Sequence, residues 1–186
     1  MTKRCFIAIN LPNSVKNEMA TLITNLKQTN PNRAIKYVDS LTGHLTLHFL
    51  GSITDRQIEQ VKEILKANCF DCQSTKLISN KIGGFPNLVK PRIVFLACQE
   101  LGQGILKNLQ ARLGTELKKI GLAVDHRPWQ PHLTLARIKE SEQFKIENVI
   151  VPKFEILVKS LELMESQLKP SGPEYKILQS FNLLNS

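Results

Sequence analysis

Apolar residues recur along this chain with two periods, one typical of helices and the other typical of strands. Spacing of three or four residues predicts three helices, of which one runs to about Gln28, one follows Thr54 and one covers residues 103–121. Asn13 or Ser14 is expected to cap the first helix, because side-chain oxygens there can accept the unpaired N–H groups of the first turn. Thr54 is expected to cap the second helix in the same way.

Alternating and continuous apolar runs predict the strands. These runs lie at residues 4–10, 35–38, 44–50, 76–79, 93–97, 132–138, 154–164 and 175–184. The Gly/Pro-rich residues 83–91 are expected to form a loop, and residues 169–173 a turn. Helices and strands mix without strict alternation, so the predicted fold class is α+β. No low-complexity tract or long linker interrupts the chain, so we expect one domain over residues 1–186.

One tetrapeptide occurs twice, 88 residues apart, as His44-Leu45-Thr46-Leu47 and His132-Leu133-Thr134-Leu135. Each copy lies in a predicted strand, and a predicted helix follows an early strand in each half of the chain. In a strand, residues two apart share a face, so each histidine projects beside its threonine and the leucines project to the opposite face. The repeat therefore predicts two related strands, each with a buried leucine face and a polar His/Thr face.

The polar faces of the two strands suit phosphoester chemistry. Histidine has an ordinary pKa near neutrality, so a facing pair can hold one neutral and one protonated ring. One ring can act as a base while the other acts as an acid, and threonine hydroxyls can donate to phosphate oxygens. The alternative is that each histidine is an ordinary strand residue. That reading suits one such histidine, but an identical second copy makes it the weaker interpretation.

The composition favours an anionic partner. Among 186 residues, 25 Lys+Arg and 16 Asp+Glu give a formal charge of +9, and 42% hydrophobic residues are enough for a sizeable core. The excess is local: residues 1–38 hold six basic residues and one acid, and residues 72–99 hold four basic residues and no acid. We expect both regions to border the two motif strands and to bind nucleic acid, through Lys81, Lys90 and Arg92 in the second region.

The cysteines and the start of the chain bear on location. The early apolar run from Cys5 to Ile9 is too short for a signal peptide or a membrane span, so a cytoplasmic protein without membrane association is expected. Cys69 and Cys72 have the spacing of half a zinc site or of a redox pair. Because no second such pair occurs, the four cysteines are interpreted as free thiols and no metal site is expected.

Longer stretches around the repeat resemble a known family. The motifs extend as His44-Leu-Thr-Leu-His48-Phe-Leu-Gly51 and as Trp129-Gln-Pro-His132-Leu-Thr-Leu-Ala-Arg137, with an opening strand at 4–12 and a closing turn and strand at 166–175. The chain thereby resembles the two-histidine (2H) phosphoesterase superfamily over nearly its whole length. Within it, the chain is most similar to the RNA 2',3'-cyclic phosphodiesterases, historically called 2'-5' RNA ligases.

The resemblance implies a bilobal α+β fold, with two pseudo-symmetric antiparallel-sheet lobes, helices outside and the two motifs in a central cleft. It also implies hydrolysis of RNA 2',3'-cyclic phosphate ends to a 2'-phosphomonoester without a metal or cofactor. By analogy His44 is the general acid and His132 the general base, although the pseudo-symmetry lets these roles exchange. Thr46 and Thr134 are then expected to bind phosphate oxygens.

The remaining candidate binding residues are Arg137, His48, Phe6 and Trp129. Arg137 matches a phosphate-contacting arginine of the family, but it is an odd number of steps from His132 and needs a bulge, a twist or a strand end to reach the site. His48 stands where the family often has Arg or Lys, and strand parity places it on the His44 face. Phe6 and Trp129 are candidates for stacking on a base or lining the cleft, with ordinary core packing as the alternative.

A few further residues and readings stay open at this point. Tyr37 is another aromatic candidate. His126 and Arg127 precede the second motif and are candidates for contact with an RNA backbone, with a solvated side chain as the alternative for Arg127. The alternative functions are hydrolysis or joining of 2',5' linkages, and a non-catalytic RNA- or nucleotide-binding module. The expected partners are RNAs with 2',3'-cyclic phosphate ends, tRNA fragments being one candidate, and the protein is expected to be a monomer.

Overall fold

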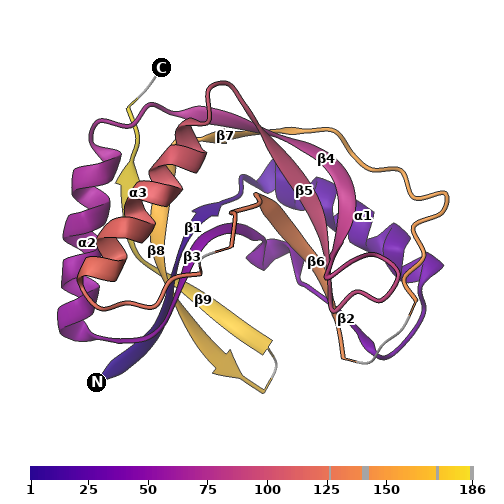
Figure 1. The fold of residues 1–186 in the computed structure, drawn as a ribbon. Helices are drawn as coiled ribbons and strands as arrows, with labels where there is room; N and C mark the ends of the chain where they lie inside the picture. The colour runs from indigo at the N-terminus through magenta and orange to yellow at the C-terminus, as the bar shows by residue number, and fades with distance from the viewer. Residues whose placement is uncertain (126, 140–142, 171, 185–186) are drawn as a thin grey trace.

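The computed structural model describes residues 1–125, 127–139, 143–170 and 172–184, and its strands form one curled antiparallel sheet (Figure 1). The strands are β1 (Thr2–Asn10), β2 (Ile35–Tyr37), β3 (His44–Thr54), β4 (Thr75–Phe85), β5 (Ile93–Leu101), β6 (His132–Ile138), β7 (Glu155–Val158), β8 (Ser160–Lys169) and β9 (Gly172–Asn182). The helices are α1 (Asn13–Thr29), α2 (Asp55–Cys69) and α3 (Ile105–Lys119), with a short 3-10 helix η1 (Ser40–Thr42). The predicted α+β class is confirmed.

The strand order has an internal symmetry. Along the sheet it is β7-β4-β5-β6-β3-β1-β8-β9, with β2 beside β6, so the two motif strands β6 and β3 are neighbours at the centre. On each side of them, β5 corresponds to β1, β4 to β8 and β7 to β9. The two expected lobes are thus the two halves of a single sheet rather than two separate sheets. The cause is the pairing of β3 with β6, which joins the halves through the motifs themselves.

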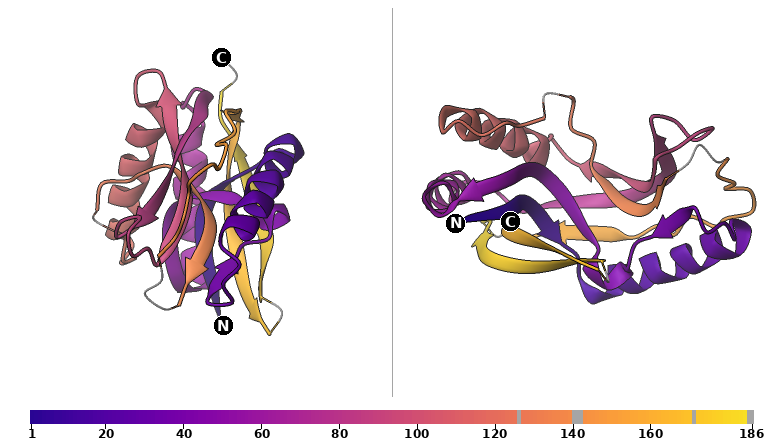
Figure 2. Two further views of the ribbon diagram at one scale, coloured as in Figure 1. Left: turned by 90° about the vertical axis from the view of Figure 1, so that its right-hand side faces the viewer. Right: turned by 90° about the horizontal axis from the view of Figure 1, so that it is seen from below.

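The two halves exchange helices (Figures 1 and 2). The helix α1 follows β1 but lies beside the half that contains β6, where the Tyr37 hydroxyl of β2 donates to the carbonyl oxygen of Leu26 at 2.9 Å. The helix α3 follows β5 but packs on β3 of the other half, where Nε2 of His48 donates to the carbonyl oxygen of Gln110 at 2.8 Å. Each half therefore completes its core with a helix supplied by the other.

The N-terminal cap of α2 agrees with the sequence-based expectation, whereas that of α1 differs from it. The Thr54 hydroxyl accepts the Gln57 N–H at 3.2 Å and the Gln57 side chain accepts the Thr54 N–H at 3.0 Å, which is a complete capping box for α2. The expected side-chain cap of α1 is wrong. Pro12 is the N-cap there with no side-chain cap, and Asn13 is already helical, because the proline ring fixes a φ of −66° that suits the start of a helix.

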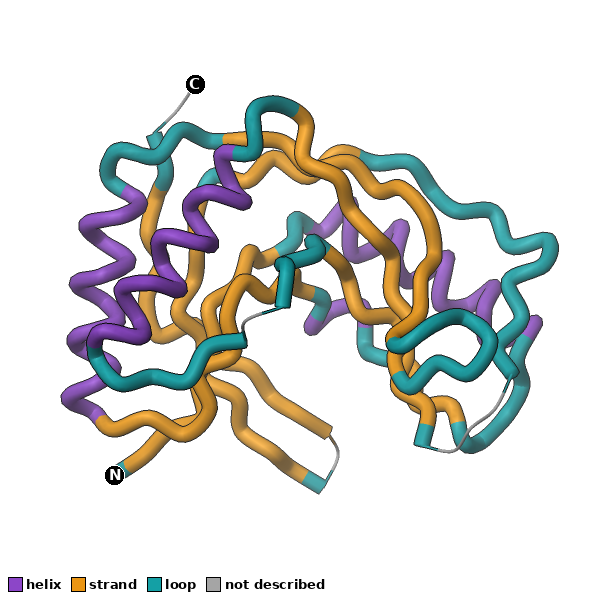
Figure 3. Tube along the Cα trace, viewed as in Figure 1, coloured by secondary structure: helices purple, strands orange, loops and turns teal. Residues whose placement is uncertain are grey.

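Several strands differ in extent from the sequence-based expectation (Figure 3). The strand expected over 154–164 is divided at Lys159 into β7 and β8, because β7 pairs with β4 in one half and β8 pairs with β1 in the other. The strand β4 continues to Phe85, so the loop expected over 83–91 begins later. The hairpin of β8 and β9 is also tighter than expected, because Lys169 already pairs with Gly172.

Two equivalent β-bulges interrupt the motif strands. Between β1 and β3 the register passes from Ala8–Thr46 to Ile7–His48, which leaves Leu47 as the extra residue. Between β5 and β6 it passes from Phe95–Thr134 to Val94–Ala136, which leaves Leu135 as the extra residue. A bulge adds a residue to one strand and reverses the alternation beyond it. Residues 48–50 and 136–138 therefore lie on the face opposite to the one that simple parity predicts. In β3 a second bulge at Leu50 restores the original alternation, so that Ile53 is buried.

The core lies between the sheet and the helices. Leu45, Leu133 and Leu135 have no exposed surface and Leu47 is 4% exposed, as the leucine face of the repeat predicts. A second small cluster of Phe6, Ala8 and Met164, with Tyr175 packed against it, lies apart from this core. Among the residues that the structure describes, no helix is long and apolar enough to cross a membrane.

Candidate active site

The two motifs meet at one residue pair. Leu45 of β3 pairs with Leu133 of β6 in antiparallel orientation. In such a ladder His44 lies across from Thr134, and Thr46 across from His132, so the histidines are diagonal neighbours. Diagonal neighbours are about 7–8 Å apart at the backbone, which leaves room between the rings for one small group. All four polar side chains are partly exposed while the leucines between them are buried, so they share one open face.

Each imidazole is oriented by the same backbone contact. Nδ1 of His44 lies 2.9 Å from the carbonyl oxygen of Thr42, and Nδ1 of His132 lies 2.7 Å from the carbonyl oxygen of Gln130. A carbonyl oxygen only accepts, so Nδ1 carries the proton in both rings. This bond fixes the tautomer and leaves Nε2 available in each ring, as a base when the ring is neutral and as an acid when it is protonated.

Aromatic rings support both histidines. The ring centroid of His44 lies 4.9 Å from those of Phe6 and Tyr175, and the ring centroid of His132 lies 5.2 Å from Phe95 and 5.4 Å from Phe85. Phe6 is only 2% exposed, so it has no free face for a base. The prediction that Phe6 stacks on a base is therefore wrong, and Phe6 instead holds the ring of His44 in place.

The electrostatic surroundings favour neutral rings in the absence of substrate. Burial lowers the pKa of His44, the bond to the Thr42 carbonyl opposes this, and the charges of Arg137, His132 and Lys16 lower the pKa further. Burial also lowers the pKa of His132, opposed by its bond to Gln130 and reinforced by Arg137. Both histidines thus lie within electrostatic reach of Arg137, and His44 lies within reach of His132.

Arg137 reaches this site because of the bulge at Leu135. Ala136 is fully buried and Arg137 is exposed, so the residues beyond the bulge have the reversed alternation. The sequence predicted that a bulge, a twist or a strand end is needed, and the structure contains a bulge. The equivalent bulge in β3 makes Phe49, which is 62% exposed, the counterpart of Arg137. One end of the pseudo-symmetric site therefore presents a guanidinium, and the other end presents an aromatic ring.

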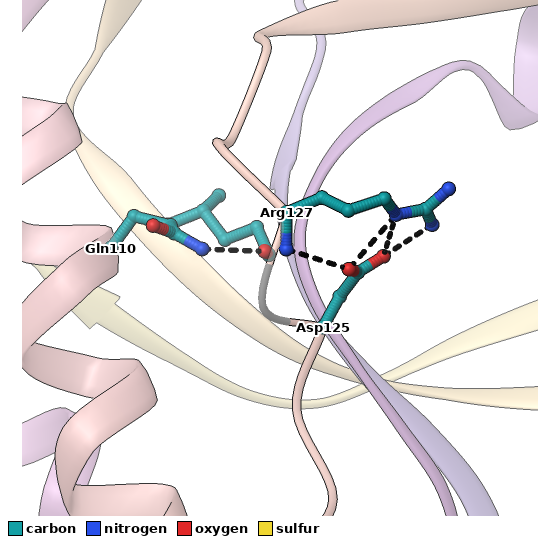
Figure 4. A network of polar contacts seen from close by, with 4 residues as sticks. Gln110, Asp125 and Arg127 are labelled. Carbon is teal, nitrogen blue, oxygen red and sulfur yellow. Dashed lines mark hydrogen bonds and ion pairs between the residues drawn. The ribbon is translucent and has the colours of Figure 1, made fainter. Parts of the chain in front are cut away.

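The expected role of His48 is wrong. The bulge at Leu47 turns His48 to the helix side of the sheet, where it is 4% exposed and donates to the carbonyl oxygen of Gln110. Gln110 also donates from its side chain to the carbonyl oxygen of Leu47 at 3.5 Å (Figure 4). Burial lowers the pKa of His48, so it is a neutral residue that attaches α3 to β3 rather than a phosphate ligand.

Trp129 acts on the site through the backbone. Its indole N–H donates to the carbonyl oxygen of Thr46 at 3.0 Å, and its ring is partly buried against the core. The next residue, Gln130, supplies the carbonyl that orients His132. The indole thus ties the segment before the second motif to the first motif, and it is a positioning residue whose contribution to base binding stays a prediction.

The other residues predicted near RNA fall into different surroundings. Arg127 forms an ion pair and hydrogen bonds with Asp125, so its charge is already balanced (Figure 4). His126 lies outside the described residues. The hydroxyl of Tyr37 donates to the Leu26 carbonyl oxygen of α1, as described above.

Sequence reasoning gave no site role to Tyr175, Phe95 and Lys16. Phe95 is placed beside His132 by strand pairing, because Ala97 pairs with His132 and Phe95 lies two positions away on the same strand, and the sequence alone does not show this pairing.

Among the described residues, no group of three or more His, Cys, Asp or Glu side chains is arranged to hold a metal ion. Two cavities, of about 360 and 540 Å³, are lined by other residues, although Trp129 and Pro131 border the first. The central cleft therefore stays a prediction.

The four cysteines are buried free thiols, and burial raises the pKa of Cys69 and Cys98 to about 12.

Comparison with known proteins agrees with this geometry. The 2'-5' RNA ligase superfamily matches residues 13–169. An RNA 2',3'-cyclic phosphodiesterase of Archaeoglobus fulgidus is 30% identical over 184 residues, which cover 96% of this chain and 99% of that protein. A crystal structure of a Thermus thermophilus protein has a TM-score of 0.79 at 28% identity and covers 97% of both chains. The structure of E. coli LigT complexed with 3'-AMP has a TM-score of 0.79 at 22% identity, with 98% of this chain and 99% of that chain covered, which shows a shared fold.

Two histidine–threonine strands at the centre of one curled sheet define a two-histidine phosphoesterase. This chain belongs to the 2'-5' RNA ligase superfamily, in agreement with the resemblance carried by its motifs.

Proposed function

We propose that this protein hydrolyses RNA 2',3'-cyclic phosphate ends to 2'-phosphomonoesters, with His132 as general base and His44 as general acid. The observation that carries the proposal is the paired Nδ1–carbonyl bond, which presents two Nε2 atoms on one face of the sheet. The name of the Archaeoglobus fulgidus relative supports the choice of substrate. The role of each histidine follows from the family resemblance, since the contacts are nearly symmetric.

The proposed reaction is one in-line displacement. Nε2 of neutral His132 takes a proton from water as the water oxygen attacks phosphorus, and the bond from phosphorus to the 3' oxygen breaks. Protonated His44 gives its Nε2 proton to that oxygen, so the product has a free 3' hydroxyl and a 2' phosphate. The two proton transfers leave His132 protonated and His44 neutral, and exchange with solvent restores the starting state.

The substrate itself can supply the charge that the acid needs. Without ligand, burial and Arg137 favour the neutral form of both rings. A bound phosphodiester carries one negative charge and offsets the charge of Arg137, so the pKa of the nearby rings rises. Binding therefore promotes protonation of one histidine, and the diagonal arrangement keeps the second proton away through repulsion between the two rings.

The phosphoryl oxygens have donors on the same face. The hydroxyls of Thr46 and Thr134 lie across from the opposite histidine in the ladder, where they can donate to non-bridging oxygens. Arg137 can offer two parallel N–H donors. These groups provide a base, an acid and positive charge, so the proposal includes no metal or cofactor. Four other properties remain predictions: a cytoplasmic location, a monomeric state, a single domain over residues 1–186, and tRNA fragments as substrates.

The proposal is tested with a 2',3'-cyclic adenosine dinucleotide in the presence of EDTA. We expect turnover to a 2'-phosphomonoester, and a loss of about 10²–10⁴-fold in kcat for His44→Ala and for His132→Ala. A substrate with sulfur in place of the 3' oxygen has a leaving group that needs little protonation. It should restore turnover in His44→Ala but not in His132→Ala. Restoration in His132→Ala instead would show that the two roles are reversed.

A further inference from the structure

The strands β2 and β3 together form one interrupted partner of β6. Lys36 pairs with Arg137 and Leu45 pairs with Leu133, both in antiparallel orientation and both on the side of β6 away from β5. The chain leaves the ladder between them to form η1, whose Thr42 carbonyl orients His44. The segment that leads into His44 therefore also carries Lys36, on β2, past Arg137.

Lys36 and Arg137 are two cations placed directly opposite each other. Residues paired across antiparallel strands project from the same face with Cβ atoms about 4.5–5.5 Å apart. Both side chains are exposed, and neither belongs to any of the ion pairs found among the described residues. Lys76 on β4 shows the usual arrangement, because it pairs with Glu155 of the neighbouring strand at 3.0 Å. Opposed like charges destabilise a sheet, so this pair is best explained by a bound anion.

The neighbours of Arg137 show in which direction the positive charge extends. On one side β5 places the apolar residue Ile93 opposite Arg137. Arg92, the preceding residue, stands in a bend outside β5. On the opposite side β2 places Lys36. The cationic surface thus continues from Arg137 across β2 to Lys36. The role expected for Lys81, Lys90 and Arg92 stays a prediction.

We propose that Lys36 binds the phosphodiester on the 5' side of the cyclised nucleotide, which makes an oligonucleotide end, rather than a mononucleotide, the substrate class of this site. The inference rests on the proposed function. Arg137 lies within electrostatic reach of both histidines and so meets the reacting phosphoryl group. Lys36 is its cross-strand neighbour and meets the next anion along the chain. RNA supplies two such anions in sequence, whereas a nucleoside cyclic phosphate supplies one.

The test compares a cyclic adenosine dinucleotide with adenosine 2',3'-cyclic phosphate. For Lys36→Gln we expect the ratio of kcat/KM on the dinucleotide to that on the mononucleotide to fall about fivefold. The salt dependence of the dinucleotide reaction should become shallower by about 0.7 in the slope of log kcat/KM against log salt, which corresponds to one lost phosphate contact. Lys36→Arg should retain most of the ratio. Lys66→Gln removes the same charge from an exposed position on α2 and should leave the ratio at the wild-type value.

Two further results separate this inference from the proposed function. If the wild-type protein hydrolyses both substrates and Lys36→Gln keeps the wild-type ratio, the role of Lys36 is refuted while the reaction stands. If the wild-type protein hydrolyses neither, the reaction fails, and fluorescence anisotropy with a labelled, 3'-phosphorylated adenosine dinucleotide decides about Lys36. Weaker binding by Lys36→Gln than by Lys66→Gln supports the contact, and equal binding overturns it.

Discussion

Leu45 of β3 faces Leu133 of β6, and the two halves of the sheet repeat about this pair. Because the strands are antiparallel, the pair places each histidine across from the threonine of the other motif. The sequence repeat is thereby converted into a site with two similar but distinct ends. At one end Arg137 follows the bulge, and at the other Phe49 takes the equivalent position. A nearly symmetric pair of imidazoles thus lies in an asymmetric setting.

Replacing Trp129 by Phe should impair catalysis more than binding. The change keeps an aromatic ring but removes the N–H that donates to the Thr46 carbonyl oxygen. The segment that carries the Gln130 carbonyl then loses an attachment, and the orientation of His132 becomes less defined. We expect kcat to fall about tenfold, in line with loss of positioning, with less than a twofold change in KM. An unchanged kcat with a raised KM would instead identify Trp129 as a base-binding residue.

Replacing Arg137 by Gln should move the pH profile as well as lower the rate. Arg137 lowers the pKa of both histidines, so its removal raises both. Activity is lost at low pH when the base becomes protonated and at high pH when the acid becomes neutral, so both limbs of the kcat/KM profile should shift to higher pH. Arg92→Gln removes the same charge from the adjacent loop and should leave the limbs in place. Identical profiles for the two variants would contradict this placement of Arg137.

The stability of the fold should fall in mildly acidic solution. The pKa of His48 is lowered by burial, as are those of His44 and His132, while the unfolded chain keeps an ordinary value of about 6.5. Below that pH the unfolded state binds more protons, so the free energy of unfolding decreases as the pH falls from about 7 toward the folded pKa. Each histidine contributes at most about 1.4 kcal/mol per pH unit.

Urea unfolding of His48→Gln at pH 7.5 and pH 5.5 isolates the share of His48. We expect the variant to be less stable at pH 7.5, because the bond to Gln110 is altered, and to lose less stability between the two pH values than wild type does. An equal loss in both proteins would mean that His48 does not titrate in this range.

Gly114→Ala should destabilise the protein although alanine favours helices. A Cβ at this position in α3 would lie 3.1 Å from Cε1 of His48. The His48 ring is buried and bonded to Gln110, so it cannot easily move away. In an exposed helix the change would stabilise by about 1 kcal/mol. We expect a lower melting temperature than wild type, measured by circular dichroism, and a higher one would show that the contact between α3 and β3 is loose.

The sequence predicted the elements that depend on local pattern. The apolar spacing placed the helices and the motif strands, and the leucines of the repeat are buried as expected. It failed where a single extra residue changes the alternation. His48 was assigned to the site face by parity, and the bulge at Leu47 places it under α3 instead. A bulge forms in response to the partner strand, so the chain's own periodicity does not reveal it.

The sequence also did not predict how segments far apart in the chain pair and pack together. The division of residues 154–164 at Lys159 follows from pairing with strands in different halves, and the exchange of α1 and α3 follows from packing against distant strands. Phe6 has an aromatic side chain that suits stacking on a base, and only its burial in the structure argues against that role. The odd spacing of Arg137 left a bulge, a twist or a strand end open, and the structure contains a bulge. The contact of Arg137 with phosphate stays a prediction.

The most direct test of the central claim is the phosphorus NMR spectrum of a 2',3'-cyclic adenosine dinucleotide incubated with the purified protein in EDTA. The account predicts that the cyclic phosphate signal is replaced by that of a 2'-phosphomonoester. With the His44→Ala, His132→Ala double variant, the cyclic signal should persist. A 3'-phosphomonoester would contradict the assigned leaving group, and turnover by the double variant would contradict acid–base catalysis by the two histidines.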